Sequence, residues 1–183
     1  YEPKRVFETT QGSLDGLGSI VSTPKDALQP TDGKTEVPDA TRFEWINGWT
    51  PNDAMASRPD VYERKIRMTL PADSGTVIHS RDVSVYVKVK PKTPVIVENT
   101  ISEKGGLPDQ SIKIDNVVGG AKVTLTIGDK TFTKTAGPND TSVTFSPAEL
   151  KAAYDANNGL LPTGNVTVKQ EVTIQNDPSK PST

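Results

Sequence analysis

The clearest pattern in this chain is the alternation Val83-Ser84-Val85-Tyr86-Val87-Lys88-Val89. Its valines fall at every second position, and polar or amphipathic side chains stand between them. Residues two apart in a β-strand share one face of the sheet, so this segment predicts a strand with one buried face. An earlier segment repeats the period, with one face formed by Tyr62, Ile66, Met68 and Leu70. Strands that are apolar on one face are typical of antiparallel sheets, which predicts an all-β fold.

Two further sequence motifs accompany these predicted strands. The first is Val37–Trp45, which ends in Arg-Phe-Glu-Trp, and the second is Arg67–Gly75, which runs Arg-Met-Thr-Leu-Pro-Ala-Asp-Ser-Gly. Together with Val83–Val89 they resemble the Rib-type repeat of Gram-positive cell-surface proteins. The resemblance implies a β-sandwich with a short helical segment near Thr23–Leu28. The threonine and proline that open this segment are themselves a helix-start signal.

The second half of the chain predicts more short strands and one helix. We expect strands at 94–99, 111–115, 121–127, 130–134, 142–145 and 165–173. Gly128-Asp129 indicates a tight hairpin between two of them. Ser146-Pro147-Ala148-Glu149 has the residues of a helix capping box, and Asn158-Gly159 is a stop signal, so we predict a helix over 147–157. The phrases Gly120–Leu125 and Leu161–Val168 resemble Ig-like modules of the same surface proteins.

A break rich in proline and lysine, Lys90-Pro91-Lys92-Thr93-Pro94, separates the two halves. Proline cannot donate a hydrogen bond to a sheet, so this run is typical of a short, stiff connector. We therefore predict two tandem Ig-like β-sandwich domains, 1–92 and 93–175, with the short helix in the second. The closing run 176–183 has the composition of a further linker, and we expect the protein to be a monomer.

Charge and composition narrow the possible partners. The chain has 183 residues, a formal net charge of −2 and no cysteine. Lysines and acidic residues are mixed along it, which argues against nucleic acid as a partner. We expect no membrane-spanning segment and no signal peptide, because no apolar run has the necessary length. The lack of cysteine excludes disulfides and thiol chemistry.

Catalytic and metal-binding residues are sparse. The single histidine, His79, has Asp73, Ser74 and Ser80 nearby in sequence, but no nucleophile motif accompanies it, so we expect no enzyme activity. Zinc would need clustered His and Cys. Oxygen-bearing side chains that could bind calcium are present at Asp129, Asn139, Asp140, Asp155, Asn157 and Asn158. Asp and Asn are also common in turns and helix caps, which explains their presence more simply. We predict no metal and no cofactor. We also expect no intramolecular Lys–Asn crosslink, because most lysines lie on the polar faces of their predicted strands.

Two tryptophans are the candidate ligand-binding residues. Exposed tryptophan faces bind sugars or protein partners. Trp45 has the phase of a core residue in its strand, so we expect it to be buried. Trp49 lies in a loop, Gly48-Trp49-Thr50-Pro51, where exposure is expected. If either residue contacts a ligand, Trp49 is the better candidate.

These patterns support a structural function. The resemblance implies an extracellular location on a Gram-positive cell wall, where the chain would be a spacer that projects an adhesive region. Its partners would then be the neighbouring domains of the same protein. Two alternatives stay open: a direct adhesin module that binds a host matrix protein or a glycan, and an accessory carbohydrate-binding domain of a secreted enzyme.

Overall fold

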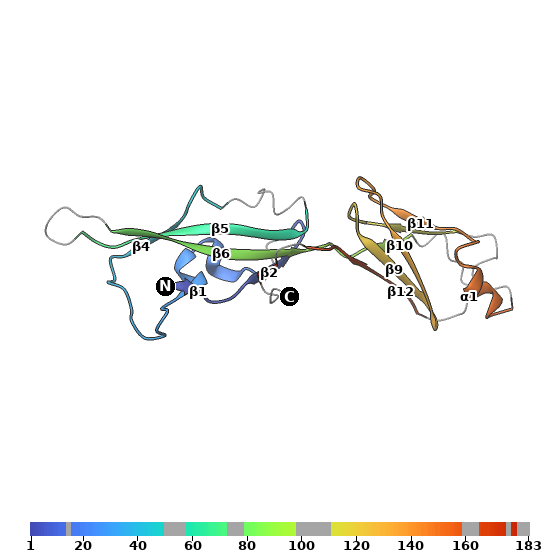
Figure 1. Ribbon diagram of the computed structural model, residues 1–183, viewed down its shortest axis with the longest axis horizontal. Helices are drawn as coiled ribbons and strands as arrows, with labels where there is room; N and C mark the ends of the chain where they lie inside the picture. The colour runs from blue at the N-terminus through green and yellow to red at the C-terminus, as the bar shows by residue number, and fades with distance from the viewer. Residues whose placement is uncertain are drawn as a thin grey trace. The chain divides into compact units, whose positions relative to one another are not determined.

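The computed structural model describes residues 1–13, 16–49, 58–72, 79–97, 111–158, 165–174 and 177–178. The chain divides into two compact units (Figure 1). Unit 1 comprises Tyr1–Lys90 and Ile174–Thr183, and unit 2 comprises Pro91–Thr173. Strands make up most of the regular structure in both units, which confirms the predicted all-β class. The domain bounds expected from the sequence stay a prediction.

Unit 1 is built on a four-stranded sheet with the order β2-β6-β5-β4. Its strands are β2 (Phe7–Thr10), β4 (Arg42–Trp45), β5 (Asp60–Thr69) and β6 (Ser80–Lys90). The alternating valines of β6 are all buried, as the period predicts. The β6–β5 and β5–β4 pairs are antiparallel, but β2 runs parallel to β6. The sequence predicted only antiparallel pairing, because the period of two is the same in both kinds of sheet.

Short elements cover the apolar face of this sheet. They are the paired strands β1 (Glu2–Pro3) and β3 (Leu28–Gln29) and the 3₁₀ helices η1 (Gly18–Val21) and η2 (Pro24–Ala27). From them, Ile20, Ala27 and Leu28 enter the core that the valines of β6 form. The helical turn predicted from Pro24 is therefore present as η2, although the Thr23 side chain makes no capping hydrogen bond.

Unit 2 contains two three-stranded sheets, β10-β9-β12 and β11-β8-β7. The strands are β7 (Val95–Ile96), β8 (Ile112–Asp115), β9 (Lys122–Ile127), β10 (Lys130–Thr135), β11 (Val143–Phe145) and β12 (Val166–Glu171). Both sheets supply side chains to one core, which contains Ile114, Leu125 and Phe145. Ile127 pairs with Lys130, so Gly128-Asp129 forms the predicted two-residue hairpin.

The helix of unit 2 is shorter than predicted. α1 spans Lys151–Asp155 rather than 147–157. The capping box does form, because Ser146 N–H donates to Glu149 Oε2 at 2.8 Å and Glu149 N–H donates to Ser146 Oγ at 3.2 Å. Leu150 is fully buried and has φ −92° and ψ 1°, outside the helical region, so the regular helix begins only after it.

Candidate functional site

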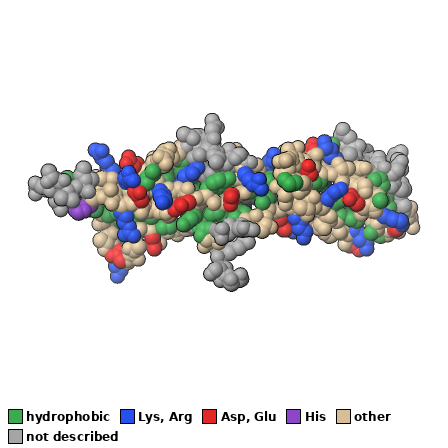
Figure 2. Space-filling view, turned by 45° about the horizontal axis from the view of Figure 1, so that its top comes forward, with side chains coloured by type: hydrophobic (Ala, Val, Ile, Leu, Met, Phe, Trp, Pro, Cys, Tyr) green, Lys and Arg blue, Asp and Glu red, His purple; other side chains and the backbone are tan. Residues whose placement is uncertain are grey.

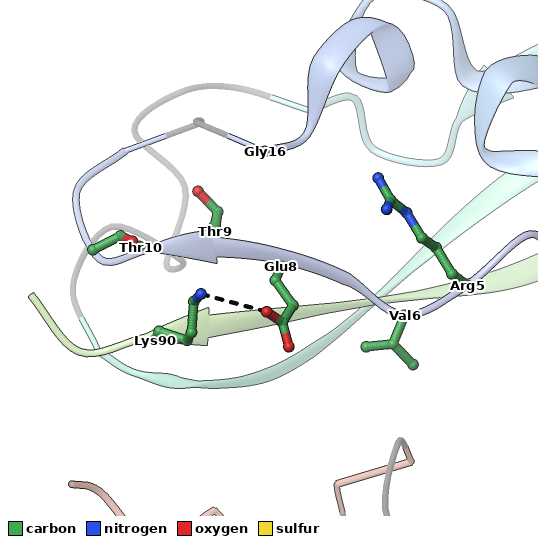
Figure 3. Close-up of a pocket in the computed structure, with 7 residues that line it drawn as sticks. All are labelled: Arg5, Val6, Glu8, Thr9, Thr10, Gly16 and Lys90. Atoms are coloured by element: carbon green, nitrogen blue, oxygen red, sulfur yellow. Dashed lines mark ion pairs between the residues drawn. The ribbon is translucent and has the colours of Figure 1, made fainter.

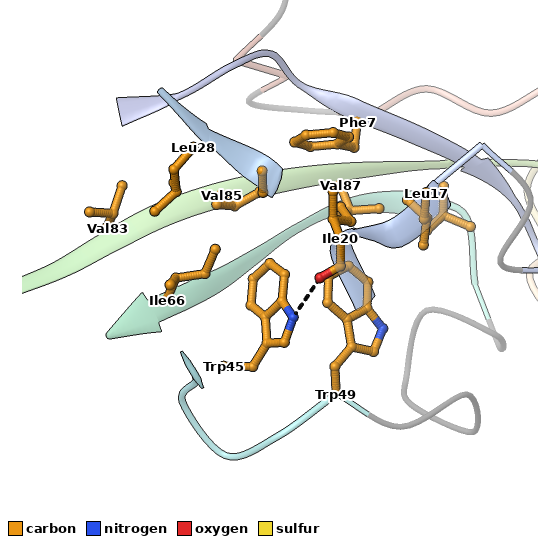
Figure 4. Close-up of a cluster of buried hydrophobic side chains, with 12 residues drawn as sticks. Phe7, Leu17, Ile20, Leu28, Trp45, Trp49, Ile66, Val83, Val85 and Val87 are labelled. Carbon is orange, nitrogen blue, oxygen red and sulfur yellow. Dashed lines mark hydrogen bonds between the residues drawn. The ribbon is translucent and has the colours of Figure 1, made fainter. Parts of the chain in front are cut away.

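Trp45 and Trp49 lie against each other inside unit 1 (Figure 4). Their ring centroids are 4.6 Å apart and the planes meet at 81°, an edge-to-face arrangement. Each residue is only 9% exposed. Trp45 Nε1–H donates to the carbonyl oxygen of Ile20 at 3.0 Å, which connects β4 to the η1 segment. The pair belongs to the core of this unit.

The expected exposure of Trp49 is therefore wrong, whereas the expected burial of Trp45 is confirmed. The cause is a turn directly after β4. Asn47 and Gly48 have φ of 66° and 70°, and Gly48 N–H donates to Trp45 O at 3.1 Å. Only glycine and, less often, asparagine adopt this left-handed conformation readily, and it turns the chain so that Trp49 packs onto Trp45. The Asn-Gly dipeptide was the sequence signal for this turn.

A shallow hollow of about 490 Å³ lies beside β2 in unit 1 (Figure 3). Its lining consists of Arg5, Val6, Glu8, Thr9, Thr10, Gly16 and Lys90. Gly16 lies at one side of the hollow. Any other residue at this position would place its Cβ 2.6 Å from the Glu8 carbonyl oxygen. Only a residue without a side chain permits this close approach. A second hollow of about 450 Å³ shares Arg5 and Gly16 with the first.

The charges at these two hollows are mixed. Lys90 Nζ lies 3.4 Å from Glu8 Oε2. The Arg5 guanidinium lies 5.1 Å from the centroid of the Phe7 ring, and Asp26 borders the second hollow. Figure 2 likewise shows basic and acidic side chains interspersed on the visible face. This arrangement offers no concentrated field for a strongly charged ligand.

Several residues considered for catalysis or calcium binding make local structural contacts. His79 is exposed, and its carbonyl oxygen accepts a hydrogen bond from Leu70 N–H. Asp140 Oδ2 accepts from Gly137 N–H at 2.7 Å, and Asp155 pairs with Lys151. Among the described residues, no group of three or more His, Cys, Asp or Glu side chains could hold a metal ion. Asp73 and Ser74 lie outside the described residues.

One buried polar side chain that the sequence did not single out is Gln170 in β12. Its Oε1 accepts a hydrogen bond from Val118 N–H at 2.9 Å. Its Nε2 donates to the carbonyl oxygens of Lys92 at 2.6 Å and Asn116 at 2.8 Å. Gln170 has the same strand phase as Val166 and Val168, so the alternation already placed it on the inner face. It joins three segments of unit 2.

Asp177 is a second buried polar residue, in the run expected to be a linker. Its side chain is 2% exposed, and Oδ2 lies 2.8 Å from Nζ of Lys88, whose side chain is 20% exposed. Both residues belong to unit 1. The last segment of the chain is thus attached to β6 at this position. No signal in the sequence indicated the pairing, because it joins residues 89 positions apart.

Comparison with known proteins gives relatives in Staphylococcus aureus. The chain is 29% identical over 180 residues to the "Extracellular matrix-binding protein ebh" of Staphylococcus aureus strain MW2. It is 28% identical over 177 residues to the "Extracellular matrix-binding protein EbhB" of strain N315. Each match covers 95% of this chain. It covers only 2% and 4% of the relatives.

The other two comparisons gave no match. No protein-family model matches the chain, and no solved structure matches it. Within the part of the chain that the structure describes, no helix is both long enough and apolar enough to cross a membrane. Similarity to the staphylococcal proteins is therefore the finding that bears most directly on function.

Proposed function

We propose that this chain is a non-enzymatic spacer module of a Gram-positive cell-surface adhesin, built from Rib-type and Ig-like units. It would hold a binding region at a distance from the cell wall. Its working parts would be the two folded cores and the short proline-containing connector after Lys90. The chain spans about 2% of the MW2 relative and 4% of the N315 relative, so a spacer would be one small part of such a protein.

The burial of both tryptophans is the observation that carries this proposal. A carbohydrate-binding or partner-binding platform needs an accessible aromatic face. Trp45 and Trp49 are instead 9% exposed and pack edge to face in the core of unit 1. The hollows beside β2 are shallow, and their charges are mixed. The two aromatic residues best suited to binding a ligand are thus part of the hydrophobic core.

One observation favours a second candidate, direct adhesion. The relatives are named extracellular matrix-binding proteins, and the part of them that binds could be the part this chain resembles. A host matrix protein or glycan would then contact the surface beside β2. The third candidate function, an accessory carbohydrate-binding domain, loses its main support because neither tryptophan is exposed.

A binding screen separates these two functions. The full chain is tested by surface plasmon resonance against matrix proteins and glycans, beside the double variant Arg5→Ala/Lys90→Ala. Lys130→Ala, in the hairpin of unit 2, is the matched control. We expect no saturable binding by any of the three. Saturable binding that the double variant loses and the control keeps would show that the chain is an adhesin module rather than a spacer. Trp49→Ala is unsuitable here, because it would disrupt the core.

A further inference from the structure

We propose that unit 1 contains a mechanical clamp, formed by the parallel pairing of β2 with β6, that resists tension along the chain. The inference rests on the proposed spacer function, because a spacer on a cell surface carries force between its two ends. The clamp itself is argued from strand direction, register and burial.

The first step is the position of the two strands. β2 and β6 are the first and last strands of the four-stranded sheet along the chain. Their register runs from Phe7 opposite Val87 to Thr10 opposite Lys90. Because the pair is parallel, the chain enters β2 at one end of the paired segment and leaves β6 at the other. Tension between these points therefore pulls the strands in opposite directions along their common axis.

The second step is the response of the hydrogen bonds. Under such shear, all bonds across the pair stretch together, whereas strands pulled apart from one end lose their bonds one at a time. A backbone hydrogen bond contributes about 1 kcal/mol net, so breaking several at once presents a higher barrier than breaking each in turn. Gln11 N–H adds one more bond at the end of the pair, donating to Lys90 O at 2.8 Å.

The third step is the packing beneath the pair. Phe7 and Thr9 of β2 are 4% and 3% exposed, and Val87 and Val89 of β6 are fully buried. Sliding β2 along β6 would move these side chains out of close packing, which adds to the resistance. β6 is itself held by β5, which pairs with it along the whole of Asp60–Thr69. The exposed Glu8–Lys90 ion pair adds little.

Unit 2 offers an internal contrast. Its first strand, β7, pairs antiparallel with β8, and its last strand, β12, pairs antiparallel with β9. Among the described residues these two terminal strands lie in different sheets and do not pair with each other. Gln170 Nε2 donates to Lys92 O at 2.6 Å, so the chain enters unit 2 beside the end at which β12 leaves it. Tension on β12 would therefore begin at Glu171, opposite Lys122, and separate the strand bond by bond. The clamp is therefore a feature of unit 1.

The test pulls the same strand pair in two directions. The chain has no native cysteine, so handles can be attached through two introduced ones. Arg5→Cys/Lys90→Cys loads β2 and β6 from opposite ends, in shear. Thr10→Cys/Lys90→Cys loads them from the same end, because Thr10 lies opposite Lys90. Both full-length variants lose the same ion pair of Lys90. Tryptophan fluorescence checks that unit 1 is folded in each.

Optical tweezers at one pulling speed then compare the rupture forces. We expect the shear variant to resist at least about twofold more force, because its bonds break together. Equal forces in the two directions would overturn the clamp. A second measurement needs no cysteine. Gln11→Pro removes the N–H that donates to Lys90 and should lower the rupture force of unit 1, whereas Thr31→Pro, in an exposed turn, should not.

These outcomes are independent of those of the binding screen. A chain that binds a matrix protein and also shows the directional difference would retain the clamp but lose the spacer function. A chain that binds nothing and shows no directional difference would leave the spacer function standing without the clamp.

Discussion

The two tryptophans have similar burial but different polar contacts. Trp45 Nε1–H donates to Ile20 O, whereas Trp49 Nε1–H has no hydrogen-bond partner among the described residues. Both rings fill the same part of the core, so removing either ring creates a cavity. Removing only the indole nitrogen affects the two positions differently. The core function of these residues can therefore be separated from their hydrogen bonding by comparing phenylalanine and alanine variants.

We predict that Trp45→Phe lowers the free energy of unfolding of unit 1 by about 1–2 kcal/mol more than Trp49→Phe does, because it leaves the Ile20 carbonyl unpaired. Either alanine variant should cost about 3–5 kcal/mol. Urea unfolding followed by the fluorescence of the remaining tryptophan measures these differences. Equal costs for the two phenylalanine variants would show that the Ile20 bond contributes nothing. A nearly neutral Trp49→Ala would mean that the ring is accessible in solution, which would revive it as a ligand-binding residue.

Glu149 makes the stability of unit 2 depend on pH. The hydrogen bond from Ser146 N–H and then the contact with the Lys134 ammonium hold the pKa of Glu149 below its usual 4.5. The folded state thus favours the carboxylate. Its contribution is fully present above pH 4.5 and is lost as the pH falls through the lowered pKa of the folded state.

We predict that the urea midpoint of unit 2 decreases as the pH drops below about 4.5 through the lowered pKa of Glu149, and that Glu149→Gln reduces this decrease. NMR signals of Val123 and Leu125 follow unit 2 alone. Asp82→Asn is the matched control, because the pKa of Asp82 is also lowered, by Arg67, but in unit 1. An identical acid dependence in wild type and Glu149→Gln would contradict the prediction.

At the scale of elements, Gln170 joins β12 to the Asn116–Val118 turn and to Lys92 by three hydrogen bonds. We predict that Gln170→Leu lowers the free energy of unfolding of unit 2 by about 2–4 kcal/mol, since it leaves a buried N–H and two carbonyl oxygens unpaired. Near neutral pH, Gln170→Glu should lower the free energy of unfolding as much as Gln170→Leu does, because its carboxylate would face two carbonyl oxygens.

Acid separates the two Gln170 variants. The protonated carboxyl group of Gln170→Glu can again donate one hydrogen bond, so part of its stability should return as the pH falls, whereas Gln170→Leu cannot recover in this way. Lys169→Leu, at the exposed neighbouring position, should change stability by less than about 0.5 kcal/mol. Urea unfolding followed by NMR of unit 2 measures all three. A loss in Lys169→Leu as large as that in Gln170→Leu would assign the effect to the strand rather than to the hydrogen bonds.

The elements that the sequence predicted well are those with a local signal. The strand at Val83–Val89 and the hairpin at Gly128-Asp129 follow from alternation and turn chemistry, and both are present. The parallel direction of β2 could not be predicted, because alternation does not depend on the direction of the neighbouring strand. The burial of Trp49 depends on a left-handed turn that places a loop residue in the core. Polar composition at 176–183 concealed the pairing of Asp177.

At the scale of the whole molecule, the residues that the structure describes form two separate cores. The buried apolar residues of the first lie between Phe7 and Val89, and those of the second between Ile112 and Tyr154. Both tryptophans of the chain belong to the first, so tryptophan fluorescence reports on unit 1 alone. The two unfolding transitions can therefore be measured separately in the intact protein.

The segment after unit 2 completes unit 1 through the pairing of Asp177 with Lys88. Ending the chain after Thr173 would leave a largely buried ammonium group without its partner. We predict that this truncation lowers the free energy of unfolding of unit 1 by about 1–3 kcal/mol, the range for stranding one member of a partly buried ion pair. The transition of unit 2, whose hydrophobic core does not include Asp177, should keep its midpoint. Tryptophan fluorescence and NMR in the same urea titration follow the two units.

Lys88→Met identifies the cause. In the truncated chain it removes the unpaired ammonium group and keeps the apolar part of the side chain, so it should restore much of the lost stability. In the full chain the same substitution removes the ammonium group that lies against the buried Asp177 carboxylate and should be destabilising. This reversal of sign is specific to an ion pair, because a change that acted only through β6 would have the same sign in both chains. If truncation leaves the fluorescence transition unchanged, Asp177 does not bind Lys88 in solution, and 176–183 is the linker that its composition predicts.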